Sequence, residues 1–384
     1  MNLSRRNALR FMAGSAAALA AAGGGGAWWL NRRAERAIAP WAAAGSGMYD
    51  DWRMKALAYA VLAPSPHNRQ PWLLDLVGVD DIRVYCELDR RLPATDPFDR
   101  QTVIGFGCFL ETLRMAAAQD GAAVQVEAFP EGLPDEQLDH RPVALVRRVE
   151  GAAAPDPLFA HVLDRHTSRE AYRAELVSPE ALDVLAAAVP DAADYRAHTG
   201  LSELAALREL TVQAFDLETH VLPVHEENIP LMRIGRAEMD ANPDGLALDG
   251  PVVEFARLVG LVSHKSLADP ESATYRRAVD KMLADAAASP AYVSLSTDGN
   301  SRQDQLDSGR DWMRLQLAAT GQGLSMQPMS QALQEYAQMA EMIAELHRML
   351  RPQGGRVQML ARMGYGPAQR PAPRWPLQDR ILPA

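Results

Sequence analysis

The stretch APSPHNRQPW at residues 63–72 decides how the rest of this chain is interpreted. Apolar residues recur at helical spacing from Met48 to Leu62, and that helix must end at the prolines that follow, because proline excludes helical geometry at the residue before it. The motif therefore lies on a loop. The Ser65 hydroxyl and the amides of Asn68 and Gln70 suit a heterocycle whose edge alternates hydrogen-bond donors and acceptors, although composition alone favours an Asn- and Pro-rich turn capped by a packed Trp72.

A second cluster of polar residues is RHTSR at residues 165–169. Arg165 and Arg169 are four residues apart, so we expect them to share one face of a starting helix with the Thr167 hydroxyl between them. Two guanidinium groups in this arrangement can bind a phosphate bidentately, assisted by a helix N-terminus. A solvated basic turn, paired with the neighbouring acidic residues, is an equally good interpretation of this segment alone.

Both clusters resemble elements of the nitroreductase superfamily. The ordered match of Pro-Ser, Asn and Gln-Pro-Trp is similar to the family's flavin loop, and residues 165–169 are similar to its Arg-x-Ser-x-Arg element, with Thr167 in place of serine. The resemblance implies that FMN is bound, with the loop on the flavin pyrimidine and the arginines on the phosphate and the pyrimidine. Arg69 departs from the pattern, since a small hydroxyl residue is more usual there. A bulky cation at this position can change substrate access or the flavin potential.

The end of the chain extends the resemblance. The stretch GQGLSMQP at residues 321–328 is similar to the family segment that lines the flavin ring, which implies contacts from Met326 and Gln327. The stretch PRWPL at residues 373–377 is similar to the closing segment that carries a flavin-contacting arginine, here Arg374. The resemblance covers most of residues 48–382. Its details match the Acg-like branch of the superfamily, many members of which carry a twin-arginine leader.

The resemblance implies an α+β fold, with an antiparallel sheet flanked by helices in two fused, pseudo-symmetric halves at residues 48–150 and 158–384. The runs at residues 72–77 and 82–85 favour two paired strands, and residues 101–118 favour a long buried helix. A Gly-, Ala- and Pro-rich connection lies near residues 150–157. In the second half we expect helices at residues 179–188, 202–217, 302–319 and 331–350, and a strand at 356–363.

A faint internal duplication supports the two halves. Aligning Gly107 with Gly309 also aligns Leu113 with Leu315 and Gly121 with Gly323. The first half carries the flavin-like loop, and the second carries the arginines but has VPDAA at residues 189–193 where its own loop should fall. The duplication therefore predicts one composite flavin site and one degenerate site per chain. Residues 222–289 have no counterpart in the first half, so we expect an insertion that covers the site like a lid.

Residues 1–40 are predicted to be an export address. Arg5 and Arg6 precede an uncharged, Ala- and Gly-rich stretch that ends at Leu30, as in a twin-arginine signal. Cleavage near residues 37–39 and retention as a membrane anchor both remain open, because twenty uncharged positions can span roughly 30 Å of hydrocarbon. The signal predicts export by the twin-arginine machinery to the periplasm or to the outer face of the cytoplasmic membrane.

Several other classes of protein are disfavoured by the sequence. The formal charge is -10 without a basic stripe, which argues against a nucleic-acid partner. Cys86 and Cys108 have no zinc-like spacing, and a disulfide between them stays possible because sequence cannot set their separation. His220 and His225 fall on different helix faces without an evident third ligand, so no metal site is predicted.

The predicted function is an FMN-dependent oxidoreductase of nitroreductase type that acts on small acceptors such as nitroaromatics or quinones. Arg165 or Arg169 is expected to stabilise negative charge on the reduced flavin. The alternative is a protein that binds and shields FMN under its lid with little or no turnover. Because NAD(P)H is scarce outside the cytoplasm, the unidentified electron donor is expected to be a membrane quinol or a protein.

Overall fold

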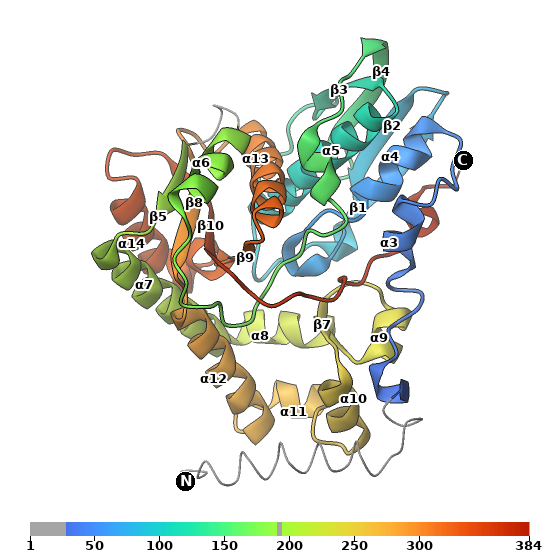
Figure 1. Cartoon of the computed structure of the whole chain (residues 1–384). Coiled ribbons are helices and arrows are strands. Elements are labelled where there is room, and N and C mark those ends of the chain that lie inside the picture. The colour runs from blue at the N-terminus through green and yellow to red at the C-terminus, as the bar shows by residue number, and fades with distance from the viewer. Residues whose placement is uncertain (1–27, 190–193, 384) are drawn as a thin grey trace.

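A computed structural model describes residues 28–189 and 194–383 (Figure 1). The twin-arginine pair and nearly all of the uncharged stretch after it lie outside the described residues. Among the residues that are described, no helix is long and apolar enough to cross a membrane.

The first half is a four-stranded antiparallel sheet with helices packed on it. Its strands are β1 (Trp72–Val77), β2 (Asp81–Cys86), β3 (Ala122–Ala128) and β4 (Ala144–Ala152), in the spatial order β1-β2-β4-β3. Helix α4 (Trp52–Ala60) leads into the loop before β1, and α5 (Arg100–Gln119) connects β2 to β3. The short helix α3 (Ala39–Ala44) packs on α4. The fully buried Trp72 packs on Phe109 of α5, with ring centroids 4.9 Å apart, so β1 and the loop before it are fixed against the core.

The second half repeats this plan. Strands β5 (Asp194–His198), β8 (Ala291–Thr297), β9 (Ser325–Pro328) and β10 (Arg356–Gly364) form a second antiparallel sheet in the order β5-β8-β10-β9. Helix α6 (Pro179–Ala188) precedes β5 as α4 precedes β1, and α13 (Arg302–Gly321) connects β8 to β9 as α5 connects β2 to β3. The fold is therefore α+β with two fused halves, as predicted.

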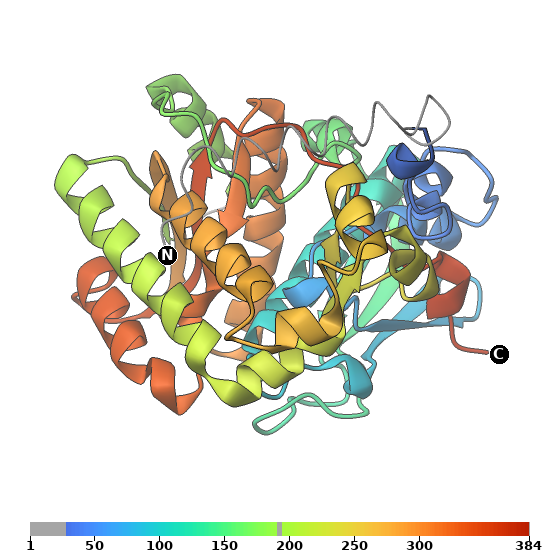
Figure 2. The same ribbon diagram turned by 90° about the horizontal axis from the view of Figure 1, so that it is seen from below.

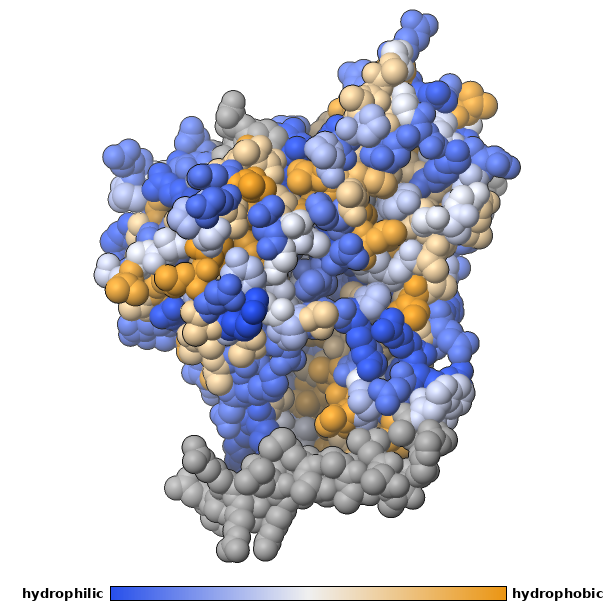
Figure 3. Space-filling view, viewed as in Figure 1, coloured by the Kyte–Doolittle hydropathy of each residue, from blue (hydrophilic) through white to orange (hydrophobic). Residues whose placement is uncertain are grey.

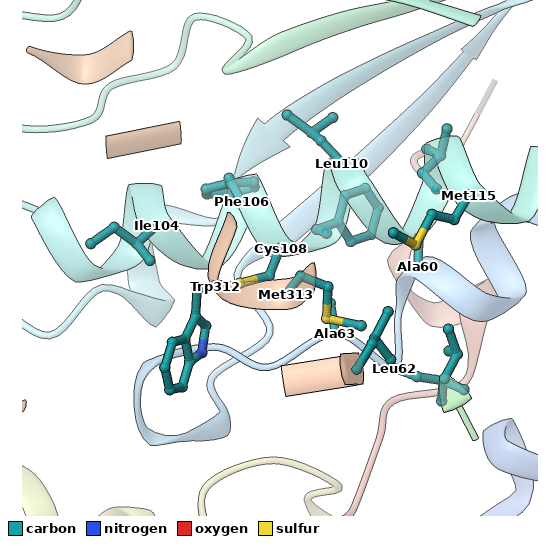
Figure 4. Close-up of a cluster of buried hydrophobic side chains, with 14 of the residues drawn as sticks. Ala60, Leu62, Ala63, Ile104, Phe106, Cys108, Leu110, Met115, Trp312 and Met313 are labelled. Carbon is teal, nitrogen blue, oxygen red and sulfur yellow. The ribbon is translucent and has the colours of Figure 1, made fainter. Parts of the chain in front are cut away.

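Helices α5 and α13 pack against each other at the centre, between the two sheets (Figure 1). A Cβ atom on Gly107 would lie 2.1 Å from the Leu306 carbonyl oxygen, and one on Gly309 would lie 2.0 Å from the Ile104 carbonyl oxygen. These reciprocal contacts follow the alignment that pairs Gly107 with Gly309, so the predicted duplication is confirmed at the centre of the fold. Both glycines are needed because the two backbones approach too closely for any side chain. Figure 4 shows the apolar cluster that surrounds this crossing.

A large insertion separates β5 from β8, where the first half has only the tight β1–β2 turn. It begins with α7 (Leu201–His220), and its remaining elements lie beneath both halves in Figure 1 and cross the molecule in Figure 2. They are α8 (Leu222–Asn228), β6 (Met232–Ile234), α9 (Arg236–Ala241), β7 (Leu246–Leu248), α10 (Pro251–Leu258), α11 (His264–Ala268) and α12 (Ala273–Ala287). Figure 3 shows a hollow among these elements with apolar side chains inside it.

The single helix expected at residues 331–350 is wrong in its first half. Two short 3-10 turns at Ser330–Leu333 and Ala337–Met339 precede α14 (Ala340–Leu350). The Leu333 carbonyl accepts a hydrogen bond from Arg100, and the Glu335 side chain pairs with Arg100 and Arg356. These contacts with distant residues replace the helical hydrogen bonds that local periodicity suggested.

Candidate functional site

A cavity of about 280 Å³ lies between the two halves and the insertion. The volume is near the lower end of the range for small-molecule sites, about 300–1,000 Å³. Residues 64–67 and α5 line it from the first half, α13 and β9 from the second, and α7, α8 and α12 from the insertion. Four of the predicted cofactor-binding residues line this cavity: Ser65, Thr167, Arg169 and Gln327.

The loop at residues 63–71 has an unusual backbone. His67, Asn68 and Gln70 have φ angles of 45°, 53° and 50°, in the left-handed region that residues other than glycine seldom adopt. Asn and His occur in this conformation more often than most residues, whereas Gln loses on the order of 1–3 kcal/mol. The Ser65 hydroxyl accepts a hydrogen bond from the Gln70 backbone N–H at 2.9 Å and so closes the loop. A strained loop on a cavity wall is typical of a binding site.

The side chains of Asn68, Gln70 and Arg374 form a buried network beside the cavity. Arg374 donates from Nη1 to Asn68 Oδ1 at 2.6 Å, and the Trp375 backbone N–H donates to Gln70 Oε1 at 2.9 Å. Gln70 Nε2 donates to the Pro243 carbonyl at 2.8 Å. These three predicted cofactor-binding residues do not line the cavity. They instead hold the loop against the C-terminal segment and the insertion.

Arg165 lies behind the cavity wall. Its Nη1 donates to Gln316 Oε1 at 2.9 Å, and burial lowers the pKa of the guanidinium to about 10. Gln316 does line the cavity, and its buried Nε2 has no hydrogen-bond partner within the described part of the chain. Arg165 therefore orients an amide whose free N–H group is available to an acceptor.

Arg169 lines the cavity and is paired with nothing in the described residues by hydrogen bond or ion pair. Its neighbour Glu170 pairs with Lys281 at 2.8 Å instead, which removes the interpretation of this segment as a basic turn that pairs within itself. Desolvation by the surrounding protein lowers the pKa of Arg169. A guanidinium without a counterion, exposed on a cavity, is suited to bind an anion.

The expected helix at residues 165–169 is wrong. Thr167 forms a parallel β-bridge with Met326, and the Ser168 N–H donates to the Met326 carbonyl at 3.2 Å. Pairing with β9 keeps the segment extended, so Arg165 and Arg169 have separate surroundings. Met326 is buried, and Gln327 faces the cavity while its Oε1 accepts a hydrogen bond from Arg362.

His67 also lines the cavity, although the sequence gave no reason to select it. Its Nδ1 is buried without a hydrogen-bond partner among the described residues. Burial, followed by the charges of Arg169 and Arg69, lowers the pKa of the imidazole to about 4. The ring is therefore neutral near pH 7 and offers either a donor or an acceptor, according to its tautomer.

Arg69, the departure from the family pattern, anchors the insertion. Its Nη1 and that of Arg90 each lie 2.7 Å from Asp244 Oδ2, and Arg233 Nη2 lies 2.5 Å from Asp244 Oδ1. The Asp244 side chain is only 3% exposed, so these contacts are shielded from water. We call Asp244 and its three arginines the Asp244 anchor.

The two cysteines form no disulfide with each other, and His225, one of the two histidines considered in the sequence, contacts another part of the insertion. Cys86 and Cys108 are both free and buried, and Cys108 Sγ donates to the Gly309 carbonyl at 3.2 Å. His225 lines the cavity and lies 3.0 Å from the Ala268 carbonyl. Within residues 28–189 and 194–383, no three His, Cys, Asp or Glu side chains are grouped so that they could hold a metal ion.

Similarity to known proteins supports the resemblance to the nitroreductase superfamily, although no family model matches the chain. The chain is 27% identical over 318 residues to the putative NAD(P)H nitroreductase Rv3131 of Mycobacterium tuberculosis, covering 81% of this chain and 84% of that protein. It is 37% identical over 75 residues to the putative NAD(P)H nitroreductase acg of the same organism, covering 20% of this chain and 22% of the relative.

Solved structures similar to this chain are shorter than it is. One is the FMN-dependent nitroreductase NfnB from Mycobacterium smegmatis in complex with NADPH, at 16% identity, with 56% of this chain and 92% of that chain covered and a TM-score of 0.34. Another is a nitroreductase-like family protein from Bacillus cereus, at 13% identity, with 61% and 99% covered and a TM-score of 0.32.

Proposed function

We propose that this protein binds FMN in the cavity between its halves and acts as an FMN-dependent oxidoreductase of nitroreductase type on small acceptors such as nitroaromatics or quinones. The observation that carries the proposal is the unpaired Arg169 on the same cavity as the strained loop at residues 63–71. The sequence similarity to proteins named putative NAD(P)H nitroreductases supports the same reaction class.

The residues that line the cavity fit the chemistry of FMN. Arg169 offers a free cation for the phosphate or for negative charge on the reduced ring, and Gln316 Nε2 offers an unused N–H group for a ring acceptor. Ile104 and Trp312 add apolar surface for a flat ring system. Of the two arginines considered for charge stabilisation, Arg169 is the better placed, because Arg165 is bonded to Gln316 behind the wall.

Bound FMN would supply the hydride or electron transfer, so no side chain is needed as a nucleophile. The chain's own part is to hold the cofactor, to exclude water and to orient the second substrate. The network of Asn68, Gln70 and Arg374 serves this part by fixing the loop against the C-terminal segment. His67 remains neutral near pH 7 and adds no second positive charge beside Arg169.

A second candidate function is sequestration of FMN without turnover. The Asp244 anchor favours it, because the buried Asp244 ties the insertion to Arg69 of the cofactor loop and to Arg90 of the first half, while Arg233 holds the same carboxylate from within the insertion. We also retain the proposal that the chain is exported by the twin-arginine machinery to the periplasm or the outer face of the cytoplasmic membrane. A membrane quinol or a protein is then the proposed electron donor, in place of the NAD(P)H in the relatives' names.

The absorbance spectrum of the purified protein tests these proposals. Bound flavin that bleaches on anaerobic addition of NADPH or a quinol, and recovers with a nitroaromatic or quinone, supports the oxidoreductase. Flavin that bleaches only with dithionite supports sequestration or an untested donor. Failure to bind FMN, both on purification and when FMN is added, would overturn both functions.

A further inference from the structure

A group of polar side chains on the cavity wall includes none of the predicted cofactor-binding residues. It consists of Glu218 on α7, Asn228 at the end of α8 and Gln334. Gln334 Nε2 donates to Glu218 Oε1 at 2.8 Å, and both side chains are buried. We call these three side chains the acidic group, because they include a carboxyl that is held in place.

Two acceptor atoms of this group have no partner in the described part of the chain. The buried atoms Gln334 Oε1 and Asn228 Oδ1 have no hydrogen-bond partner among the described residues. Glu218 forms no ion pair with any Lys, Arg or His that the structure describes. Burial raises the pKa of Glu218, and Glu227 adds to the rise, while hydrogen bonds from Gln334 and Gln331 lower it. The acidic group thus has acceptors in excess and lacks a cation.

Apolar and aromatic walls surround these acceptors. Phe215, Tyr275 and Met282 line the same part of the cavity, and Tyr275 makes an edge-to-face contact with His225 at 5.2 Å between ring centroids. The Tyr275 hydroxyl donates to the Thr219 carbonyl at 3.0 Å, which fixes the ring. Ring faces beside a carboxyl group are the usual surroundings of a bound ammonium ion.

We propose that the acidic group is a second binding subsite, which takes the protonated amine of a small, largely apolar ligand. An ammonium group supplies N–H donors for the unpartnered acceptors, and its charge stabilises the ionised form of Glu218 that burial disfavours. Arg169 also lines the cavity and suits an anion, so the cavity carries groups for ligands of both charges. The subsite rests on the proposed function only for the identity of the ligand at Arg169.

The experiment compares two nearly isosteric, redox-inert probes on the FMN-loaded protein, 2-phenylethylamine and 2-phenylethanol, by isothermal titration calorimetry. We expect the amine to bind at least about tenfold more tightly, as for a charge-assisted hydrogen bond. Glu218→Gln should remove this preference while it retains alcohol binding, which shows that the pocket is intact. Glu226→Gln is the matched control, because Glu226 is exposed on the same insertion and does not line the cavity.

Proton release gives a second readout. Because the amine binds the ionised carboxylate, its affinity should rise with pH across the range in which Glu218 titrates, a range that burial moves above that of an ordinary glutamate. Binding at a pH within that range releases a proton from Glu218. Titrations in two buffers of different ionisation enthalpy should show this release in the native protein and not in Glu218→Gln. Equal affinity for the two probes, or unchanged amine binding in Glu218→Gln, would overturn the inference. Flavin absorbance of the same samples reports separately on FMN binding.

Discussion

The cavity has a pseudo-symmetric counterpart on the other side of the α5–α13 crossing. The two regions differ in whether their charged side chains have partners. On the cavity side, Arg169 has no partner in the described residues. On the counterpart side, Arg314 lies 3.0 Å from Glu111 and 2.6 Å from Asp156. The position equivalent to Gln316 is Arg114, which lies 2.7 Å from the same Glu111.

The difference indicates which of the two pseudo-equivalent regions is the better candidate for a ligand site. Paired charges fill the counterpart region with bonds between protein groups, so a ligand there would have to displace them. An unpaired cation on a cavity has the opposite meaning, because it can bind an anion without first losing a protein partner. The cavity side is therefore where we propose that a ligand binds, whereas the counterpart side is filled by ion pairs between protein groups.

Arg314→Ala tests the ion network on the counterpart side and should have the largest effect on stability. It leaves Glu111, which is 2% exposed, with only the more exposed Arg114. Loss of one partner from a buried ion pair costs about 3–5 kcal/mol of unfolding free energy. Urea unfolding measures the loss, and FMN affinity should be unchanged. Arg173→Ala, at an exposed pair with Glu175, is the control and should stay within about 1 kcal/mol of the native protein.

Asp311→Asn tests how much the buried Asp311 carboxylate, near Glu111 on the counterpart side, destabilises the fold. Desolvation raises the pKa of Asp311 from 3.8 to about 6, and its Oδ2 has no partner among the described residues. The folded state therefore holds a proton that the unfolded state releases between pH 4 and pH 6, so this group's contribution to stability falls as pH rises through that window. Asp311→Asn should be more stable than the native protein by about 2–3 kcal/mol at pH 7, and by much less at pH 4. An equal difference at both pH values would contradict the assignment.

Arg169→Ala tests the cavity side. Removal of a charge-assisted contact to an anion costs about 1.5–3 kcal/mol, so FMN affinity should fall roughly tenfold to a hundredfold. Quenching of flavin fluorescence on binding measures the FMN affinity. Stability without FMN should hardly change, because Arg169 bonds to no described residue. Arg173→Ala again serves as the control, and full retention of FMN by Arg169→Ala would remove the site assignment.

The sequence predicted most accurately those elements that local residue patterns determine. The strand at Trp72–Val77 and the helix at Pro179–Ala188 have the predicted bounds, and Gly107 and Gly309 meet as the alignment required. Strong periodicity, a proline at the start of a helix and a glycine at a close approach are local signals. They need no knowledge of distant contacts.

The sequence could not determine where the side chains of the site point. Residue types identified the loop, yet Gln70 bonds to Pro243 and Trp375, which are far along the chain, and so does not line the cavity. The Thr167–Met326 bridge likewise decides that residues 165–169 are extended. Such pairings over long sequence separations have no local pattern, and the Asp244 anchor was missed for the same reason.

Asp244→Asn should change FMN binding less than Arg169→Ala does, and it tests whether the insertion is a gate or a permanent cover. Asn retains one acceptor, and Arg69 and Arg233 retain backbone carbonyl partners at Arg90, Asp89 and Asn242. We expect the insertion to open more often and FMN to dissociate about tenfold faster, which stopped-flow fluorescence measures. Asp249→Asn, at the pair with Arg370 elsewhere in the insertion, is the matched control. If Asp244→Asn also speeds reduction by NADPH or a quinol, the anchor limits access and sequestration gains support; if only FMN release changes, the native insertion already admits the donor.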